Sequence, residues 1–517
     1  MYYKIVLCCV LSVLQLCDSA NILVVIPTPS YSHHVSFQPI WKELSLRGHK
    51  ITVITANPMN DKKLTNLTEI DISNIYECVE RYKIWELMTE KNLLRILDTL
   101  LKFLYEGTDI IFNNTQVQGL LKDPNAKFDL IFYEASAHMC LALAYKFKCP
   151  AIGIQSMDPL PIVHAIMGNP THPLVTPDYS LKIEDVENMT FMDRLSSVFC
   201  DFFSEIFLKF IVFPFMDDIN RKYFGDDIPD MNSLIDLTDM IFIITDPIFH
   251  NMRAVNPNTL NIGGGLHIKP PKPLPKDLKQ YLDEAEEGVI YFSLGSNVKG
   301  NFLDEQSKKA IISVFSQLPY KVLMKIELEN YNIPQNIKIG KWLPQQDILR
   351  HPNIKLFVTH GGLQSVQEAV TNGVPMVGIP FFGDQYNNIF KGVKKGFVVK
   401  VDKENITEES FKEALLEVLN NPKYKETTLK MKEIMYDEPM TSLEKVVWWT
   451  EYVLRHKGAK HFKSHITQIP FYQYYFLDVF GVVILGLSIL IYGFYKIFCL
   501  LRYLCTRIFS KNKTKND

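Results

Sequence analysis

Residues 357–385 combine side-chain types that could bind a phosphorylated sugar. An apolar run is followed by Gly361 and Gly362, whose small size lets the backbone approach a ligand. A helix that begins after these glycines would point its N-terminal N–H groups and its dipole at an anion. His360 could add a hydrogen-bond donor, and Glu368, two turns into the helix, could accept from hydroxyl groups. The segment predicts a phosphate site beside a polyol site.

Two neighbouring groups extend this site. Asp384 and Gln385, at the end of the same segment, pair a carboxylate with an amide, which suits a sugar whose hydroxyls each need a donor and an acceptor. Upstream, Trp342 offers a flat aromatic face close to the amide of Gln345, and stacking of a base on such a face is worth about 1–3 kcal/mol. Sites for an anion, for a polyol and for a flat base together indicate that the ligand is a nucleotide sugar.

Composition narrows the class of protein. The 517 residues suffice for several domains, and 47% hydrophobic with 22% charged residues is typical of a folded chain, which excludes intrinsic disorder. The 55 Lys and Arg residues nearly balance the 57 Asp and Glu residues. The net charge of −2 therefore gives no sign of a basic surface that would bind nucleic acid. The sequence has no Asp-x-Asp cluster suited to a divalent cation. We therefore expect no nucleic-acid partner, no metal site and no cofactor.

Two series of apolar runs predict an α/β fold with two parallel sheets. The runs lie at 22–27, 51–55, 130–133, 151–155 and 240–245, and then at 289–294, 321–325, 354–359, 375–380 and 397–401. The first turn lacks the G-x-G-x-x-G pattern of nicotinamide and flavin sites, which disfavours an oxidoreductase. A Pro-rich linker at 267–275 is expected to join domains at 21–266 and 276–470, with ligands bound in the cleft between them.

Both ends of the chain carry targeting patterns. Residues 1–20 combine a charged start, an apolar run and small residues, as a cleavable signal peptide does. Residues 477–501 are long and apolar enough for one transmembrane helix, and the basic tail at 502–517 places the tail in the cytosol and the body in the lumen. Lys513 and Lys515 match a K-x-K-x-x signal for retrieval to the endoplasmic reticulum, although a merely basic tail is the alternative.

Several side chains of the expected lumenal body are candidates for modification or burial. The four N-x-Thr glycosylation sequons are Asn66, Asn113, Asn188 and Asn405. The cysteines of this body are Cys78, Cys140, Cys149 and Cys200, which we expect to be buried thiols with at most one disulfide. Phenylalanines recur at helical spacing within residues 191–213. The favoured interpretation is that this apolar helix face packs in the core, and the alternative is that it forms an apolar acceptor pocket or a surface against the bilayer.

The chain resembles the UDP-glycosyltransferase family. Residues 357–385 match every position of the family signature, and the order of signal peptide, acceptor domain, donor domain, C-terminal span and lysine-bearing tail is similar from end to end. The Ser-His-His and Pro-Ile-Trp-Lys-Glu-Leu segments of the first βαβ unit are similar to the insect branch. The resemblance implies the GT-B architecture, which is an α/β fold of two facing Rossmann-like domains, here with a C-terminal transmembrane helix.

The resemblance also assigns roles to residues of the donor half. Trp342 would stack on uracil, while Gln345 and Glu368 would hold the ribose hydroxyls. The residues that would bind the diphosphate are Ser296, His360, Gly362 and Ser365. The residues that would bind the hexose are Gln364, Asp384 and Gln385. Gln364 departs from the Asn of many relatives, which leaves the choice of donor sugar open.

In the same way, the resemblance places a catalytic base in the first loop, where His33 and His34 are candidates. Counting back from the segment 47–49, which resembles the Arg-Gly-His of the family, selects His33 as the base and leaves His34 a structural role. Glu134 stands where the family usually has an Asp, and it would accept from the Nδ1–H of the base. The alternative for Glu134 is a position facing solvent or a helix N-terminus.

The implied activity is an inverting, metal-independent transfer of a hexose from a UDP-sugar to a hydroxyl of a small lipophilic acceptor in detoxification. UDP-glucose is the expected donor and UDP-glucuronate the alternative. A non-catalytic membrane protein that binds lipophiles or nucleotide sugars is the rival of another class. The oligomeric state stays open, with homo- and hetero-oligomers both allowed.

Overall fold

The computed structural model describes residues 19–87, 90, 92–249, 253–295, 303–326 and 331–513. The chain divides into two compact units, Met1–Lys463 and Ser464–Asp517. The expected signal peptide lies outside the described residues except for Ser19 and Ala20, and Lys515 of the expected retrieval signal also lies outside them.

The first unit contains a seven-stranded parallel sheet in the order β3-β2-β1-β4-β5-β6-β7. Its strands are β1 (Asn21–Ile26), β2 (Lys50–Thr55), β3 (Leu67–Asp71), β4 (Leu130–Glu134), β5 (Ala151–Gln155), β6 (Thr238–Ile243) and β7 (Thr259–Asn261). The strand order reverses between β1 and β4. A crevice opens at such a point because the connections leave to opposite sides.

A second parallel sheet has six strands in the order β10-β9-β8-β11-β12-β13. Its strands are β8 (Val289–Ser293), β9 (Lys321–Lys325), β10 (Ile337–Ile339), β11 (Ile354–Thr359), β12 (Met376–Gly378) and β13 (Val398–Lys400). Here the order reverses between β8 and β11. The Pro-rich stretch at 267–275 contains neither helix nor strand and connects the two halves.

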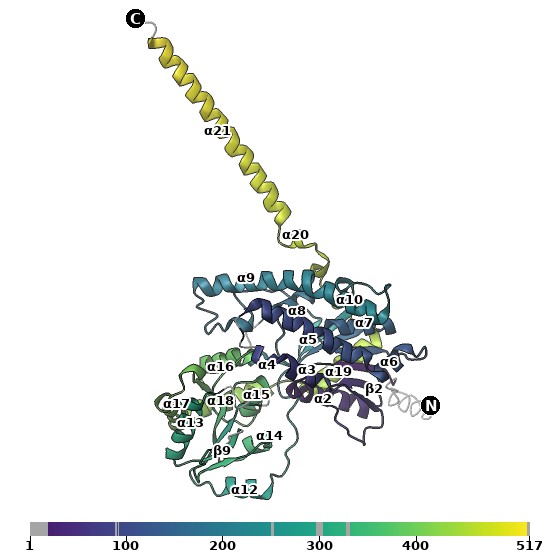
Figure 1. The fold of residues 1–517 in the computed structure, drawn as a ribbon, viewed down its shortest axis with the longest axis vertical. Helices are drawn as coiled ribbons and strands as arrows, with labels where there is room; N and C mark the ends of the chain where they lie inside the picture. Colours follow the sequence, from purple (N-terminus) through teal and green to yellow (C-terminus); the bar gives the residue numbers. More distant parts are fainter. Residues whose placement is uncertain are drawn as a thin grey trace, which may run out of the picture. The chain divides into compact units, whose positions relative to one another are not determined.

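Both sheets are covered on both faces, which explains why their central strands read as continuous apolar runs. In β1, Leu23 and Val25 pack into one hydrophobic cluster, whereas Ile22 and Val24 pack into another. The alternating residues of β8 likewise divide between two clusters. In Figure 1 the purple and blue helices belong to the first sheet, and the green helices surround β9 of the second.

The chain returns to the first sheet near its end. Helix α19 (Ser442–His456) packs against α2 (Tyr31–Leu46), and its residues Val446 and Val453 share a core cluster with Trp41. This part of the expected domain at 276–470 therefore belongs by its packing to the first half.

The expectation that residues 191–213 pack in the core is wrong for most of the segment, although its end, with Val212 and Phe213, is buried. They form α9 (Phe191–Phe207), a π-helical segment η3 (Leu208–Val212) and the start of α10 (Phe213–Phe224). Phe199 is 68% exposed and Phe210 is 72% exposed, whereas Phe213 is buried. The helical spacing was correctly recognised, but the apolar face points away from the core.

The second unit consists mainly of the long helix α21 (Leu477–Lys513). Its residues Leu477–Arg507 are long and apolar enough to cross a membrane. The helix continues beyond the expected end of the span at residue 501.

Among the described residues, all four sequon asparagines are exposed, and the cysteines of the first unit are free thiols.

Candidate active site

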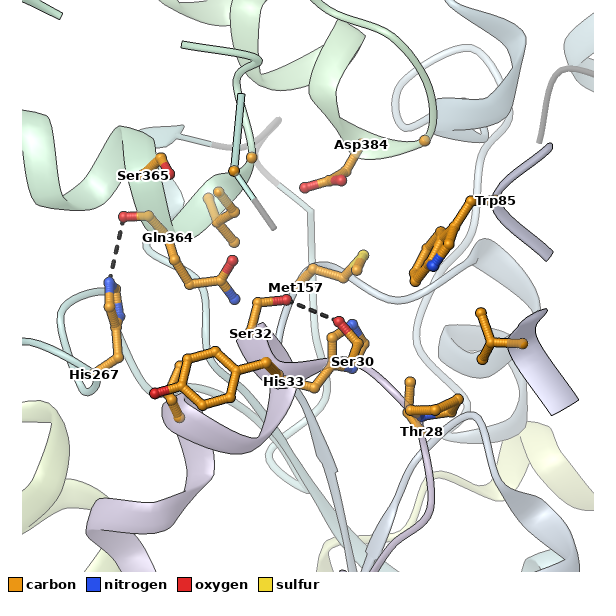
Figure 2. A pocket seen from close by; sticks show the side chains of 18 of the residues that line it. Thr28, Ser30, Ser32, His33, Trp85, Met157, His267, Gln364, Ser365 and Asp384 are labelled. Carbon is orange, nitrogen blue, oxygen red and sulfur yellow. Dashed lines mark hydrogen bonds between the residues drawn. The ribbon is translucent and has the colours of Figure 1, made fainter. Parts of the chain in front are cut away.

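A cavity of about 810 Å³ lies at the carboxyl ends of both sheets. The first half contributes the turn after β1 and the start of α2, and the second half contributes the turns after β8 and β11. These are the turns beside the two points where strand order reverses, which is where ligands of such sheets bind. Figure 2 shows Ser32, His33, Gln364 and Asp384 around this space.

His33 lines the cavity and forms a hydrogen-bonded pair with Glu134 behind it. His33 lies in the first turn of α2, rather than in the loop before it, and its Nδ1 is 2.7 Å from Glu134 Oε1. Glu134, the last residue of β4, is fully buried, and the Thr28 N–H donates to its Oε2 at 3.2 Å. Glu134 thus faces the imidazole and not solvent or a helix N-terminus.

Electrostatics define the tautomer of His33. Burial raises the pKa of Glu134, but the hydrogen bonds from His33 and Thr28 outweigh it and leave the net shift downward. Because Glu134 is then a carboxylate and can only accept, His33 Nδ1 carries the proton. The lone pair on His33 Nε2 is left available to a ligand in the cavity.

His34 makes a different set of contacts, although it is next in the sequence. It is buried, its Nε2 donates to the Thr28 carbonyl at 2.8 Å, and its Nδ1 accepts from the Thr55 hydroxyl at 2.8 Å. Burial lowers the pKa of His34. Both ring nitrogens are therefore engaged, and His34 holds the turn that supplies the Thr28 N–H to Glu134.

His360 occupies a tight corner of the donor half. A side chain at Gly295 or at Gly362 would come within 2.6 Å of its ring, so both positions require glycine. Burial, with a smaller effect of Lys325, lowers the pKa of His360 to about 4. His360 is thus a neutral donor directly before α15 (Leu363–Thr371), whose N-terminal N–H groups follow Gly362. Ser296, predicted for the same corner, lies outside the described residues.

The side chains predicted to hold ribose bond to one another. Gln345 Nε2 donates to Ser365 Oγ at 3.0 Å and to Glu368 Oε2 at 2.7 Å. Gln346 Nε2 donates to the other oxygen of Glu368 at 2.9 Å. His267 Nε2 lies 3.5 Å from that oxygen. The predicted ribose group is thus brought together as one network on the cavity wall.

Trp342 is suited to stacking because most of its ring is open. It is 65% exposed, the Lys325 ammonium lies 4.4 Å from its ring centroid, and Tyr31 of α2 contacts it edge to face at 5.8 Å. An indole with a free face can accept a planar base. Tyr31 brings the first half of the chain to the same position.

Two of the three predicted hexose residues, Asp384 and Gln385, lie at the start of α16 (Asp384–Lys395), whereas Gln364 lies in the first turn of α15. Asp384 Oδ2 accepts from Asn388 Nδ2 at 2.8 Å, and burial raises the pKa of Asp384 despite an opposing effect of nearby His33. Gln385 Oε1 accepts from the N–H groups of Phe381 and Phe382 at 2.9 and 3.2 Å. Gln385 therefore shapes its own loop, and its Nε2 is the group left for a ligand.

The cavity has a polar donor side and an apolar remainder. Among the described residues of the segment 75–179, those that line the cavity include no charged side chain. Most are apolar: Ile75, Val79, Ile84, Trp85, Phe103, Leu104, Ile111, Ala137, Met139 and Met157. Trp85 also stacks on Phe382 of the second half, with ring centroids 6.1 Å apart. One wall thus suits a lipophilic molecule and the other a charged one.

Lys325, Gln346 and His267 are among the polar lining residues that the sequence analysis did not identify. Lys325 ends β9, Gln346 follows the predicted Gln345, and His267 lies in the Pro-rich linker. The position of Lys325 at the carboxyl end of a predicted strand was a usable signal, because such ends meet at the cleft. No group of three or more His, Cys, Asp or Glu side chains that could hold a metal occurs within the described part of the chain.

Two parallel Rossmann-type sheets that share one cavity at their carboxyl ends define a GT-B glycosyltransferase fold. CalG4, the calicheamicin glycosyltransferase, has this fold with a TM-score of 0.57 at 17% identity, over 85% of this chain and 99% of that one. The family model described as UDP-glucoronosyl and UDP-glucosyl transferase matches residues 21–515. The chain belongs to this family and is a UDP-glycosyltransferase.

Similar proteins come from insects and mammals. UDP-glucosyltransferase 2 of Dactylopius coccus is 34% identical over 493 residues, which cover 93% of each chain. UDP-glucuronosyltransferase 2B9 of Macaca fascicularis is 30% identical over 92% of each chain. The chain is thus an insect-like member of the family, and relatives named for two different sugars resemble it.

Proposed function

We propose that this enzyme transfers glucose from UDP-glucose to a hydroxyl of a small, neutral, lipophilic acceptor, with inversion at the anomeric carbon. The observation that carries the proposal is the His33–Glu134 pair, because His33 lines the same cavity as the apolar wall and the donor residues. In the reaction, His33 Nε2 takes the proton of the acceptor hydroxyl as its oxygen attacks the anomeric carbon. The bond from that carbon to the diphosphate oxygen breaks, and UDP leaves.

Glu134 supports the base in two ways. It fixes the proton on His33 Nδ1, and its charge stabilises the imidazolium that forms as the acceptor is deprotonated. Because Glu134 is buried beside the ring, this attraction is weakly screened by water. The pair therefore resembles the carboxylate–histidine arrangement of other enzymes that activate hydroxyl groups.

UDP is proposed to leave with help from donors of the second half. The first N–H groups of α15 and the neutral ring of His360 would share the charge that develops on the diphosphate. Ser296 and Ser365 are proposed to bind the same group, and Lys325 adds a positive charge nearby. Transfer without a metal or cofactor remains a prediction, which full activity in excess EDTA would support.

The charge pattern of the cavity supports glucose over glucuronate. Within the described part of the chain, the lysine and arginine residues that line the cavity are Lys269, Lys272 and Lys325, and none of them belongs to the segment around Asp384 and Gln385. Among the lining residues described, the charged side chain of that segment is the Asp384 carboxyl group, and a glucuronate carboxylate placed there would lack a cation. Relatives of both kinds resemble this chain, and a glucosyltransferase is among them.

A location in the endoplasmic-reticulum membrane completes the proposal. The apolar helix α21 would span the membrane, the first unit would lie in the lumen, and Asn66, Asn113, Asn188 and Asn405, all exposed, would be available for glycosylation. Replacing Lys513 and Lys515 with Ser tests retrieval. Glycans that then mature as in the Golgi would support it, and unchanged glycans would favour a merely basic tail.

A donor screen tests the proposed activity. The full-length protein is incubated with a simple phenol as acceptor and with UDP-glucose, UDP-glucuronate or UDP-galactose in parallel, and consumption of each donor is measured. Preferential consumption of UDP-glucose supports the proposal. Preference for UDP-glucuronate would replace the donor assignment, and binding of UDP without transfer to any acceptor would favour the non-catalytic binder.

A further inference from the structure

An exposed apolar surface runs along α9 and η3. Phe191 is 67% exposed, and the rings of Phe199 and Phe203 stack with centroids 6.1 Å apart. The large exposed side chains of this segment are Phe191, Met192, Leu195, Val198, Phe199, Phe202, Phe203, Phe210 and Ile211. These nine residues are called the α9 surface below. Single exposed apolar residues are ordinary, whereas a continuous group of large ones marks an interaction site.

The polarity of α9 is the reverse of that of an ordinary surface helix. Ser197 is buried, and Cys200, Asp201 and Ser204 are half-buried, so polar side chains lie on the side that faces the protein. These positions recur at helical spacing opposite the exposed phenylalanines. A helix on the surface of a soluble protein buries its apolar face and exposes its polar one. The arrangement of α9 therefore indicates that its outer face meets an apolar partner or medium.

The length of chain before the candidate span limits what can cover this face. Residues 464–476 separate the first unit from Leu477, where the candidate span begins. Even fully extended, these 13 residues reach at most about 47 Å. The first unit therefore stays close to the bilayer that holds the span, and a tethered surface meets its partner at a high effective concentration.

We propose that the α9 surface inserts into the interfacial region of the membrane leaflet nearest the first unit, as a second contact besides the C-terminal helix. The proposal rests on the membrane anchoring proposed above. Phenylalanine, leucine and methionine on one face of a helix are the side chains that amphipathic interfacial helices bury at the boundary of headgroups and acyl chains. Two contacts would hold the body in one orientation on the membrane.

Photolabelling of the intact protein tests this proposal. The full-length chain is reconstituted in phosphatidylcholine vesicles that contain a phospholipid with a diazirine on its acyl chain, and the adducts are mapped by mass spectrometry after irradiation. We expect adducts within 477–507 and also within 191–212. Helix α18 (Pro422–Tyr436), which exposes Leu429 and Ile434, is the internal control and should stay unlabelled.

Matched variants separate insertion from non-specific labelling. Phe199→Ser combined with Phe202→Ser changes two exposed side chains, and labelling of 191–212 should fall several-fold while labelling of the span is unchanged. Leu429→Ser combined with Ile434→Ser should change neither. Labelling of the span without labelling of 191–212 would overturn the proposal, as would cross-links from 191–212 to a second copy of the chain. Absence of adducts in the span would instead overturn the membrane anchoring.

Discussion

Gln364 and Ser36 form a hydrogen bond that crosses the cleft. Gln364 Nε2, at the start of α15, donates to Ser36 Oγ at 3.2 Å, and Ser36 Oγ donates to the Ser32 carbonyl at 3.0 Å. The two bonds link the second half of the chain to the first turn of α2, which carries His33. An Asn at position 364 is one methylene shorter, so this link depends on the residue in which the chain departs from many relatives.

Gln364→Asn should lower kcat without weakening UDP binding. A hydrogen bond of this kind is worth about 0.5–1.5 kcal/mol, which corresponds to about a two- to tenfold change. Ser36→Ala should have a similar effect, and the double variant should be no worse than either single one because both remove the same bond. Steady-state kinetics and UDP titration measure this. Additive losses in the double variant would show that the two residues act separately.

Trp342→Ala should raise the KM for the UDP-sugar far more than the KM for the acceptor. The lost stacking is worth about 1–3 kcal/mol, or about a five- to hundredfold loss of affinity. Trp448→Ala, which removes an exposed indole from α19, serves as the control and should change neither constant. Equal effects of Trp342→Ala on the KM values of both substrates would mean that the indole stabilises the fold and does not stack on uracil.

The acceptor wall predicts discrimination against charge. A phenol and its analogue with an added carboxylate, matched in size, should differ in kcat/KM by at least about tenfold in favour of the neutral one, because an unpaired charge would be buried against apolar side chains. The two are compared with UDP-glucose held saturating. Equal turnover of both acceptors would contradict the assignment of the wall formed by Ile75, Ile84 and Trp85.

The buried side chain of His360 should make the stability of the protein depend on pH. Its pKa is lowered to about 4 by burial, while an unfolded histidine titrates near 6.5. Between these values the unfolded chain binds more protons, so this residue makes stability fall as the pH drops from about 7 toward 4. His360→Gln should therefore reduce the loss of Tm between pH 7 and pH 5. His456→Gln, at the surface of α19, is the control, and an identical pH profile for the His360 variant and the parent would refute the assignment.

The central strands and the edge strand β13 were predictable from the sequence, whereas the other three edge strands were not. Every predicted run forms a strand in the structure. Strands that are buried on both faces are apolar along most of their length, which makes them recognisable in the sequence. The strands that were missed, β3, β7 and β10, lie at sheet edges and are short or partly polar, as in the sequence Leu67-Thr-Glu-Ile-Asp71. Edge strands are recognised through their pairing partners, which periodicity does not reveal.

For the site, the sequence predicted the residues better than their contacts. His33, Trp342 and Asp384 line one cavity although more than 350 positions separate the first and last of them. The cross-links inside the site, such as that from Gln346 to Glu368, depend on side-chain reach in the folded state and leave no pattern in the sequence. The face of α9 was misassigned for a related reason: helical spacing identifies an apolar face but not what it packs against.

The role of His33 is tested most directly by turnover of an aliphatic alcohol by His33→Ala, measured beside UDP binding by the same preparation. If His33 is the general base, kcat should fall by about 10²–10⁴-fold. UDP affinity should be retained, because the UDP contacts belong to the second half. Glu134→Gln should be milder, since an amide still orients the ring but does not stabilise an imidazolium. Turnover of an acidic phenol should fall less than turnover of the alcohol, because the phenol needs less help to lose its proton. Near-normal turnover of the alcohol by a His33→Ala protein that binds UDP would show that His33 is not the general base.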